Sequence, residues 1–552
     1  TLGGAGIPSN IGLTAATGEF VGFVDSDDWV NDNAFELLVS SAEQHNADVV
    51  IGGFSTFTEH SRQYLDAYDL RVFEEIPANI AFSIKDYPMV FRLSPVPWRK
   101  LYRREFLKKH SIIYPEGDYF YEDNPLHWFV LSANPKIVKI DSIISYHRMA
   151  REGQTMYAAD YKLSAMCSHI NTIGNFIRCN ASKLNTNIIF DEYYDYCYRS
   201  TWVSKNQERK DVANVIAKQL SNIVNKNLLE MAPIEKRKNF DKVFADFESC
   251  YPSYDLTVVI PAYNCEAFIE ETVSSVLGIP TIKTNILIID DGSTDGTPEI
   301  CRRFEKYHSN IHFFEQKNKG AGRARNALIP LCTGRYTFFL DADDTVDGEG
   351  LAHAVRQATE KNNDLCFVKY KIRFHEKNLE REMFDADAAI WKSFQTCTNN
   401  DDLRKLAAGL INYPWNRIIK TELLLDKNIF FGPTVVHNDV AFHWESLLSA
   451  SSIGYSDKVV CVHRKFTNRS QVTNIADHRR LCVFDALEHT HRKVCCHRNG
   501  RDIADVWIRF ASELMDWAKS RIPEDLMFQY EQRKSRLVDQ LTSLTEERVQ
   551  NV

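Results

Sequence analysis

The sequence lacks the features that mark membrane-spanning, nucleic-acid-binding and zinc-binding proteins. It has no run of about 18 apolar residues, the length that a helix needs to cross a bilayer. Its formal net charge of −8 argues against nucleic-acid binding, which normally needs a basic surface. The 13 cysteines are scattered and none forms a Cys-x-x-Cys pair, the usual zinc pattern. Unpaired thiols are typical of a reducing compartment, so we expect a cytoplasmic protein.

What is present is a repeat built around an acidic cluster. Asp25-Ser26-Asp27-Asp28 and Asp341-Ala342-Asp343-Asp344 lie 316 residues apart, and each follows a short apolar run. Four further pairs of segments keep nearly the same spacing: residues 4–10 with 320–326, 97–102 with 414–419, Glu122-Asp123 with Asn438-Asp439, and His147-Arg148 with His463-Arg464. A constant spacing over so many landmarks indicates two copies of one domain.

The two copies differ at their N-terminal sides. The second contains a strand-rich stretch, residues 255–318, that has no counterpart in the first, because the chain starts at Thr1 just before the glycine-rich segment. We therefore expect the chain to be truncated at its N-terminus and the first copy to be partial.

The second copy alternates strand and helix signals. Strands are expected over residues 256–260, 285–289, 311–314 and 336–340, and helices over 266–277, 297–307 and from 320 onward. This alternation predicts a doubly wound, mostly parallel α/β sheet, whose ligands bind beyond the carboxyl ends of the strands. Helical patterns prevail in the remaining parts. The predicted domains are residues 1–157 (partial), 158–250 (helical), 251–475 (complete) and 476–552 (helical).

The acidic cluster is suited to a divalent cation. Asp341 and Asp343, two residues apart on a turn at a strand end, can face one hard cation whose other positions a diphosphate fills. A solvated acidic turn, or a capping run for the next helix, is the alternative for one short motif. Because the motif recurs with Asp25 and Asp27 in the same setting, the metal site is favoured.

Two glycine-containing segments of the second copy suit a nucleotide. In residues 290–296, Asp291 can accept hydrogen bonds from a base or ribose. The alternative is that this segment is an ordinary turn followed by a helix cap. Residues 320–326 begin a helix with free backbone N–H groups and two arginines, which favours phosphate; a surface helix is the alternative.

Two residue types farther along the chain complete the candidate site. Asp123 and Asp439 precede aromatic-rich helical stretches and are candidate general bases for an acceptor hydroxyl, or else helix N-caps. His147 and His463 each precede an arginine, so the imidazole is a candidate metal ligand and the arginine a counter-charge for a diphosphate. A structural histidine is the alternative reading.

Taken in order, four segments resemble the family-2 glycosyltransferases of the GT-A fold: residues 259–264, 290–296, 320–326 and 339–344. The resemblance covers both copies, roughly residues 1–157 and 251–475. It implies a nucleotide-sugar donor, a UDP-sugar for this chain, a glycan or oligosaccharide acceptor, Mn²⁺ or Mg²⁺, and inversion at the anomeric carbon. Tandem copies also look like bacterial capsule polymerases of the chondroitin- or heparosan-synthase kind. That likeness implies surface-polysaccharide synthesis, with peripheral association at membrane-bound machinery on the inner face of the cell membrane.

Carried over position by position, the resemblance implies that the nucleotide base is bordered by Pro261, Tyr263 and Asp291. It implies that Arg325 lies near the diphosphate and that Asp341 and Asp343 serve ribose and metal. It also implies that Asp439 is the catalytic base. Asp25, Asp27 and Asp123 are the equivalents in the first copy. The acidic neighbour of the base, Glu122, is replaced by Asn438 in the second copy, which is expected to shift the pKa of the base or its acceptor preference. Without its nucleotide half, the first copy is expected not to bind donor.

Two other functions fit part of this pattern. A sugar-nucleotide pyrophosphorylase would carry a glycine-rich phosphate loop after the first strand, where this chain has Pro261-Ala262-Tyr263-Asn264. A non-catalytic glycan-binding or scaffold protein with decayed sites would show no turnover of donor.

Overall fold

The computed structural model describes residues 6–59, 61–115, 121–149, 161–180, 186–205, 207, 209–228, 254–397, 399–466 and 475–550. The chain divides into two compact units, Leu2–Tyr251 and Pro252–Val552. The described cysteines are all free thiols. Within the described ranges we find no helix with the length and apolar character needed to cross a membrane.

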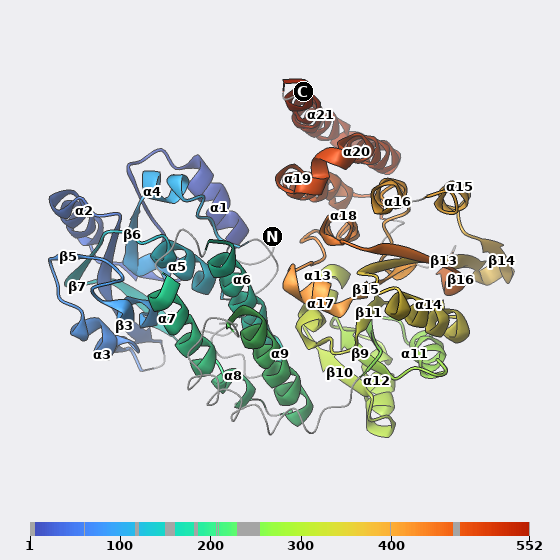
Figure 1. Cartoon of the computed structure of the whole chain (residues 1–552), viewed down its shortest axis with the longest axis horizontal. Helices are drawn as coiled ribbons and strands as arrows, with labels where there is room; N and C mark the ends of the chain where they lie inside the picture. Colours follow the sequence, from blue (N-terminus) through green and yellow to red (C-terminus); the bar gives the residue numbers. More distant parts are fainter. Residues whose placement is uncertain are drawn as a thin grey trace. The chain divides into compact units, whose positions relative to one another are not determined.

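The second unit is built on a nine-stranded sheet in the order β10-β9-β8-β11-β15-β13-β16-β12, with β14 paired to β13 (Figure 1). Its strands are β8 Leu256–Ala262, β9 Thr284–Asp290, β10 Ile311–Glu315, β11 Tyr336–Phe339, β12 Thr345–Val346, β13 Leu365–Phe374, β14 Leu379–Glu382, β15 Arg417–Lys420 and β16 Ile453–Lys465. The four predicted strands, β8 to β11, are parallel to one another, and the later strands make the sheet mixed. The predicted α/β class is confirmed.

Strand β8 runs two residues farther than its apolar run indicated. Pro261 and Ala262 pair with Ile289 and Asp290 of β9. Strand β11 pairs with β8 only as far as Val259. Pro261, which has no N–H to donate, therefore lies beyond the part of β8 that pairs with β11. The exposed Tyr263 follows directly after the last residue of the strand, Ala262.

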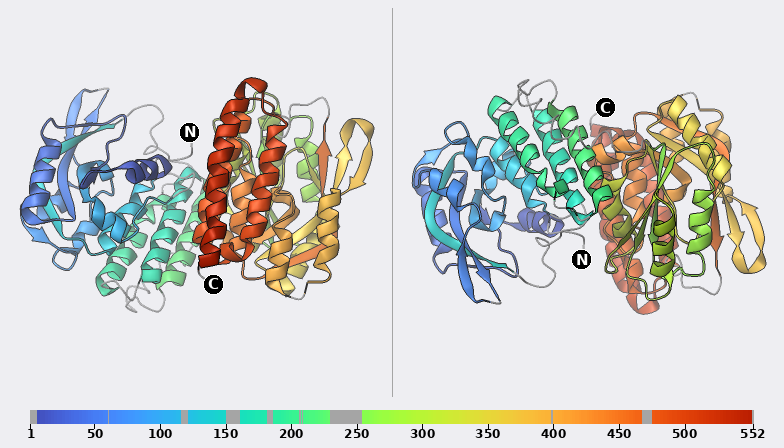
Figure 2. Two further views of the ribbon diagram at one scale, coloured as in Figure 1. Left: turned by 90° about the horizontal axis from the view of Figure 1, so that it is seen from above. Right: turned by 90° about the horizontal axis from the view of Figure 1, so that it is seen from below.

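Helices cover this sheet and continue beyond it. They are α11 Ile269–Leu277, α12 Thr297–Tyr307, α13 Ala321–Leu328, α14 Gly348–Glu360, α15 Asp385–Phe394, α16 Asn400–Ala407, α17 Thr421–Asp426, α18 Asp439–Ser449, α19 Cys482–Cys496, α20 Ala504–Lys519 and α21 Met527–Gln550. The last three pack against one another, and α20 and α21 lie side by side in Figure 2. Trp444 of α18 and Trp507 of α20 are fully buried and meet edge to face, which ties this helical group to the sheet domain.

The first unit repeats the second half of that sheet. Its strands are β1 Phe20–Gly22, β2 Trp29–Val30, β3 Val49–Thr58, β4 Gln63–Asp66, β5 Ala81–Phe82, β6 Lys100–Arg103 and β7 Ile137–Met149. The order β1-β6-β3-β7-β2, with β4 on β3, matches β11-β15-β13-β16-β12, with β14 on β13, and every pair runs in the same sense. The structure thus shows the same fold in both copies.

Helices complete the first unit and continue beyond its sheet. They are α1 Gly6–Ala15, α2 Ala34–His45, α3 Leu70–Glu75, α4 Arg104–Lys109, α5 Asp123–Ser132, α6 Ala165–Asn180, α7 Thr186–Arg199, α8 Trp202–Lys205 and α9 Lys210–Leu228. From α6 to the end of α9 the described residues contain no strand, as the lack of strand signals in this stretch indicated.

Candidate active site

The candidate site of the second unit begins at the carboxyl ends of three parallel strands. Strand β9 ends at Asp290, next to Asp291, and β11 is followed directly by Leu340 and the acidic cluster 341–344. Strand β8, between them, ends at Ala262, before the exposed Tyr263. Because parallel strands share an edge, these side chains meet at the end of the sheet where α/β proteins bind ligands.

Asp291 holds the loop that starts helix α13. One carboxylate oxygen accepts hydrogen bonds from the Lys319 N–H at 2.8 Å and the Gln316 amide at 2.7 Å, and the other accepts from the Gly320 N–H at 2.7 Å. Gly320 has φ of +90°, a conformation that favours glycine. Asp291 is only 3% exposed and burial raises its pKa. The carboxylate therefore fixes the start of α13, and the exposed Tyr263 lies at the same end of the parallel strands.

Arg325 connects the acidic cluster to the start of helix α18. Its guanidinium forms an ion pair with Asp341, lies 3.5 Å from the Asn438 amide oxygen, and covers the ring of Phe431 at 4.8 Å. Within the described residues its buried Nε has no hydrogen-bond partner. An arginine that is buried with one donor left over is suited to an additional oxyanion.

A glycine allows α13 and α18 to approach this closely. A Cβ added at Gly322 would lie 2.8 Å from the Cβ of Asn438. In the first unit the matching Gly6 donates its N–H to the Glu122 carboxylate at 3.0 Å. The position of Arg325, however, is occupied by Ser9, so Asp25 lacks the arginine that Asp341 has.

The third aspartate of the cluster is structural. Asp344 is fully buried, and its carboxylate accepts a bond from the Arg464 N–H at 2.8 Å and lies 3.1 Å from Nδ1 of His463. The first unit repeats this arrangement, with Asp28 2.9 Å from His147 Nδ1 and from the Arg148 backbone nitrogen. The carboxylate orients the imidazole and fixes which of its nitrogens faces away.

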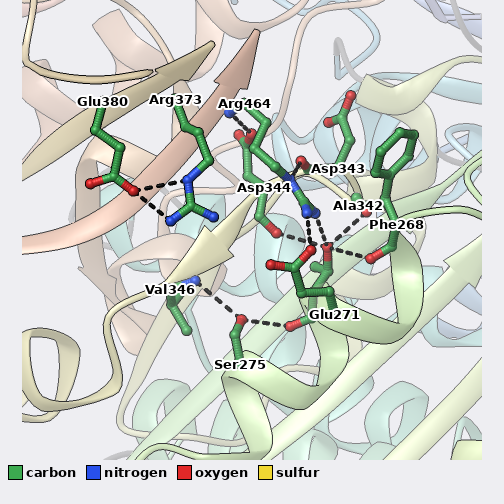
Figure 3. Close-up of polar contacts among 11 residues, drawn as sticks. Phe268, Glu271, Ser275, Ala342, Asp343, Asp344, Val346, Arg373, Glu380 and Arg464 are labelled. Carbon is green, nitrogen blue, oxygen red and sulfur yellow. Dashed lines mark hydrogen bonds and ion pairs between the residues drawn. The ribbon is translucent and has the colours of Figure 1, made fainter. Parts of the chain in front are cut away.

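Arg464 pins the acidic loop to helix α11, as Figure 3 shows. Its guanidinium contacts the Asp343 carbonyl oxygen, the Glu271 carboxylate and the Thr272 hydroxyl. Thr272 in turn donates to the carbonyl oxygens of Ala342 and Asp344 at 2.9 and 2.7 Å. Arg464 is thus engaged within the protein, whereas the Asp343 carboxylate points away from this network.

The carboxylates of Asp341 and Asp343 are suited to a metal ion that a bound diphosphate also coordinates. No group of three or more His, Cys, Asp or Glu side chains in the described ranges is arranged to hold a metal ion. Asp341 and Asp343 are both partly exposed, and His463 is oriented by Asp344. Mg²⁺ and similar hard cations are commonly held by one or two carboxylates plus substrate phosphates, so this donor set fits such an ion once a diphosphate supplies the other oxygens.

Asp439 is the first residue of α18 and not its cap, and the capping position, Asn438, makes no side-chain cap bond. Burial raises the pKa of Asp439 to about 6, while the Arg325 charge opposes the rise. For Asp123, burial and then the charges of Glu122 and Asp25 raise the pKa to about 8. At neutral pH the second-unit carboxyl is therefore ionised and the first-unit carboxyl largely protonated.

The segment before Asp439 is strained in the same way in both units. His437 has φ of +64°, and its counterpart Tyr121 has φ of +67°. Bulky residues seldom adopt this conformation, and such strain concentrates at functional sites. The two units therefore share this backbone conformation directly before Asp439 and Asp123.

Sequence reasoning missed a buried cation behind the base. Arg417 is fully buried, with its guanidinium 2.6 Å from Nδ1 of His443 and 2.8 Å from the Asn416 amide oxygen. Burial lowers the pKa of Arg417 to about 9, and Asp439 opposes that shift. In the first unit Lys100 lies 3.0 Å from His127 in the same place. The repeated segments 97–102 and 414–419 contain both cations and were the available signal.

Comparisons with known proteins identify the family. The profile described as "Glycosyl transferase family 2" matches residues 3–111 and 257–424. The putative teichuronic acid biosynthesis glycosyltransferase TuaG of Bacillus subtilis is 36% identical over 118 residues, which are 21% of this chain and 47% of TuaG. The chondroitin synthase of Escherichia coli is 38% identical over 96 residues, 17% of this chain and 14% of that protein. The chain thus spans less than half of either relative.

Among solved structures, S. aureus TarS 1-349 in complex with UDP-GlcNAc is 17% identical, with a TM-score of 0.38 over 54% of this chain and 92% of that one. The family profile itself covers half of the chain and falls on both repeats. The chain belongs to glycosyltransferase family 2.

Proposed function

We propose that the second unit transfers a sugar, with inversion, from a UDP-sugar to a hydroxyl group of a glycan acceptor, in the synthesis of a bacterial surface polysaccharide. The observation that carries this proposal is the position of Arg325. It pairs with Asp341 of the acidic cluster, contacts Asn438 and lowers the pKa of Asp439. A group suited to the donor phosphates and a group suited to the acceptor proton therefore belong to one connected site.

The residues divide into a donor side and a base. Tyr263, with Pro261 and Asp291 at the same strand ends, borders the nucleotide base, and Arg325 neutralises the diphosphate. Asp341 and Asp343, with His463 as a further candidate ligand, would hold Mn²⁺ or Mg²⁺ once the diphosphate supplies the remaining oxygens. When bound, such an ion offsets the charge that develops on the departing phosphate.

Asp439 accepts the proton of the acceptor hydroxyl as the hydroxyl oxygen attacks the anomeric carbon. The bond from that carbon to the diphosphate oxygen breaks on the opposite face, which inverts the configuration and releases the nucleoside diphosphate. In the first unit, Asp25, Asp27 and Asp123 keep the family's positions, but the unit lacks the arginine and its base is largely protonated at neutral pH. We assign it no transfer activity. The free thiols support a cytoplasmic location, and we place the enzyme peripherally at the inner face of the cell membrane.

A donor screen tests the proposal. The full chain is incubated with a panel of UDP- and GDP-sugars and Mn²⁺, and the release of nucleoside diphosphate is measured with and without short oligosaccharides. We expect release from one donor, stimulated by an acceptor and abolished by chelation. Formation of UTP from a UDP-sugar and pyrophosphate would instead identify a pyrophosphorylase, and binding of glycans without any donor turnover would identify a scaffold.

The pH dependence follows from the state of Asp439. Because this base must be ionised and burial raises its pKa to about 6, kcat/KM for the acceptor is expected to be high above pH 6 and to fall as the pH decreases through that value. Arg325 lowers this pKa, so Arg325→Gln should move the acidic limb to higher pH, besides reducing the rate. The measurement is a pH–rate profile between pH 5 and 8. A profile that is flat in wild type, or unmoved in the variant, would contradict the assignment.

A further inference from the structure

A pocket of about 580 Å³ lies beside the first residues of strand β16, away from the candidate active site. Its walls are one side of helix α14, residues 453–457 at the start of β16, and a leucine of α16. Strands β13 and β16 run parallel, and Tyr455 lies beside Phe367 whereas His463 lies beside Ile372, five residues later on β13. At about 3.3 Å per residue, the pocket is therefore roughly 17 Å along the sheet from the candidate metal ligand.

In the first unit a strand occupies the matching place. Strand β5, Ala81–Phe82, pairs with Ile137 and Val138, the counterparts of Ile453 and Gly454, and its phenylalanine is buried. In the described part of the second unit, no strand pairs with this part of β16 on the side away from β13. A place that the chain itself fills in the first unit is therefore open in the second.

Side chains already satisfy the backbone at this edge of β16. The Ile453 N–H donates to the Asn400 amide oxygen at 3.1 Å, and the Tyr455 carbonyl accepts a hydrogen bond from the Gln357 amide at 3.1 Å. An added strand would need these backbone groups for its own hydrogen bonds. The pocket is therefore better suited to a small ligand that contacts side chains than to an extended peptide.

The polar side chains of the pocket carry both signs of charge. Helix α14 contributes one stripe of residues, spaced three and four apart: His353, Arg356, Gln357, Glu360 and Lys361. Glu360 and Lys361 are exposed, and among the residues that the structure describes neither side chain forms a hydrogen bond or ion pair. With Arg356 and Asp457, they bring two positive and two negative charges. This balance suits a neutral ligand whose hydroxyl groups both donate and accept hydrogen bonds.

An aromatic ring adds an apolar surface to these polar groups. Tyr455 is partly exposed, and its ring packs against Trp391 and Phe394 of α15, with ring centres 5.9 and 5.3 Å apart. The Trp391 indole is itself held by a hydrogen bond to the Asp457 carboxylate at 2.8 Å. The counterpart of Tyr455 in the first unit is Lys139, which has no ring. A fixed ring beside donors and acceptors suits a sugar, which has C–H groups on its faces and hydroxyl groups around its rim.

We propose that this pocket is a second glycan-binding site, separate from the transfer site, and that it takes a neutral sugar residue of an oligosaccharide. The Tyr455 ring packs against the sugar, and Glu360 and Lys361 contact its hydroxyl groups. The binding goes beyond the proposed function, because it needs no donor, no metal ion and no Asp439. A glycan held here stays near the transfer site at the other end of β16, which raises its effective concentration there. That consequence, unlike the binding itself, rests on the proposed function.

Binding of trisaccharides to the full chain tests the inference. The neutral probes are maltotriose, cellotriose, mannotriose and triacetylchitotriose, and trigalacturonate is the acidic one. Each is titrated in chelator, without donor, and followed by saturation-transfer NMR. We expect at least one neutral probe to bind with a Kd of about 1 mM or lower, and trigalacturonate to bind about tenfold more weakly. Absence of binding by all four neutral probes, or a preference for trigalacturonate, would overturn the inference.

A single substitution on α14 locates the binding. Glu360→Gln should weaken binding of the preferred probe about fivefold or more, while leaving the melting temperature unchanged because Glu360 is exposed. Glu349→Gln is the matched control, because Glu349 is exposed on the first turn of the same helix and does not line the pocket. It should bind the probe like wild type. Equal affinity in wild type and Glu360→Gln would show that the probe binds elsewhere.

The first unit supplies a way to close the pocket. Gly454→Val together with Asn363→Ala introduces the residues of the first unit, Val138 and Ala47, which are both fully buried there. The two changes are made together because a Cβ added at Gly454 would lie 2.4 Å from the Asn363 amide oxygen. This double variant should bind the probe at least tenfold more weakly. If it fails to fold, Glu360→Gln decides the question.

The outcome is independent of the donor screen. Absent donor turnover refutes the proposed function and leaves this site standing, because binding is measured without donor or metal. Probe binding that Glu360→Gln does not weaken refutes the site and leaves the proposed function standing.

Discussion

Asp439→Asn is expected to lower kcat for sugar transfer by about 10²- to 10⁴-fold, the range that a general base contributes. The amide keeps the size and hydrogen-bonding reach of the carboxylate but cannot take the acceptor proton. Folding should be unaffected, because Asp439 is not the capping residue of α18 and this helix is held by the burial of Val440, Phe442 and Trp444. The measurement is the initial rate of transfer, with thermal unfolding and circular dichroism recorded on the same protein.

The first unit offers a matched control for this experiment. Asp123 begins α5 as Asp439 begins α18, and both carboxyls have raised pKa values. Asp123→Asn should leave transfer within about twofold of wild type, because a carboxyl with a pKa of about 8 is not an effective base at neutral pH. Full activity in Asp439→Asn, or an equal loss in both variants, would remove Asp439 from the role of sole base.

This asymmetry between the units has a local cause. Glu122 raises the pKa of Asp123, whereas its replacement by Asn438 removes a negative charge from beside Asp439. Arg325 then adds an opposing positive charge that Ser9 cannot supply. Asn438 therefore leaves out a charge of the kind that raises the pKa of Asp123. The expectation that Asn438 alters the pKa of the base agrees with the direction of these shifts.

The parts of the fold that sequence predicts are those with local signals. Strands β8 to β11 are short, apolar and rich in β-branched or aromatic residues, and their carboxyl ends carry the acidic and glycine-rich segments. The repeat was visible because the acidic cluster, the tryptophan segment and the histidine–arginine pair keep their spacing. The two-residue β12 and the exposed β14 have no such pattern, because their pairing depends on neighbours distant in sequence.

The parts of the site that sequence could not predict depend on long-range contacts. Asp344 looks like a third metal-binding carboxylate, and only the fold shows that it is buried against a histidine 119 residues away. The contacts of Arg417 with His443, and of His437 with Trp517, likewise join residues from separate helices and strands. A motif identifies which side chains have the chemistry to bind a metal or transfer a proton. Their burial in the fold decides which of them are accessible to a ligand.

Asp343→Ala is expected to lower the transfer rate at least about 100-fold and to abolish Mn²⁺-dependent binding of the donor, since several kcal/mol of charge stabilisation corresponds to a few powers of ten in rate. The loop itself should persist. Arg464 contacts the backbone carbonyl of Asp343, and Thr272 holds the residues on either side. Removing the side chain therefore removes a ligand-binding group from a loop that other bonds keep in place.

The next residue, Asp344, provides a control for Asp343→Ala. Asp344→Ala deletes a fully buried carboxylate that bonds to the Arg464 N–H and orients His463, so it should lower the melting temperature clearly, whereas Asp343→Ala should not. Asp27→Ala, the same change in the first unit, should leave donor binding intact. Calorimetric titration of donor in Mn²⁺ and in chelator, beside thermal unfolding of all three variants, separates the cases. If Asp343→Ala bound donor and Mn²⁺ like wild type, the metal would have to be held elsewhere than at the end of β11.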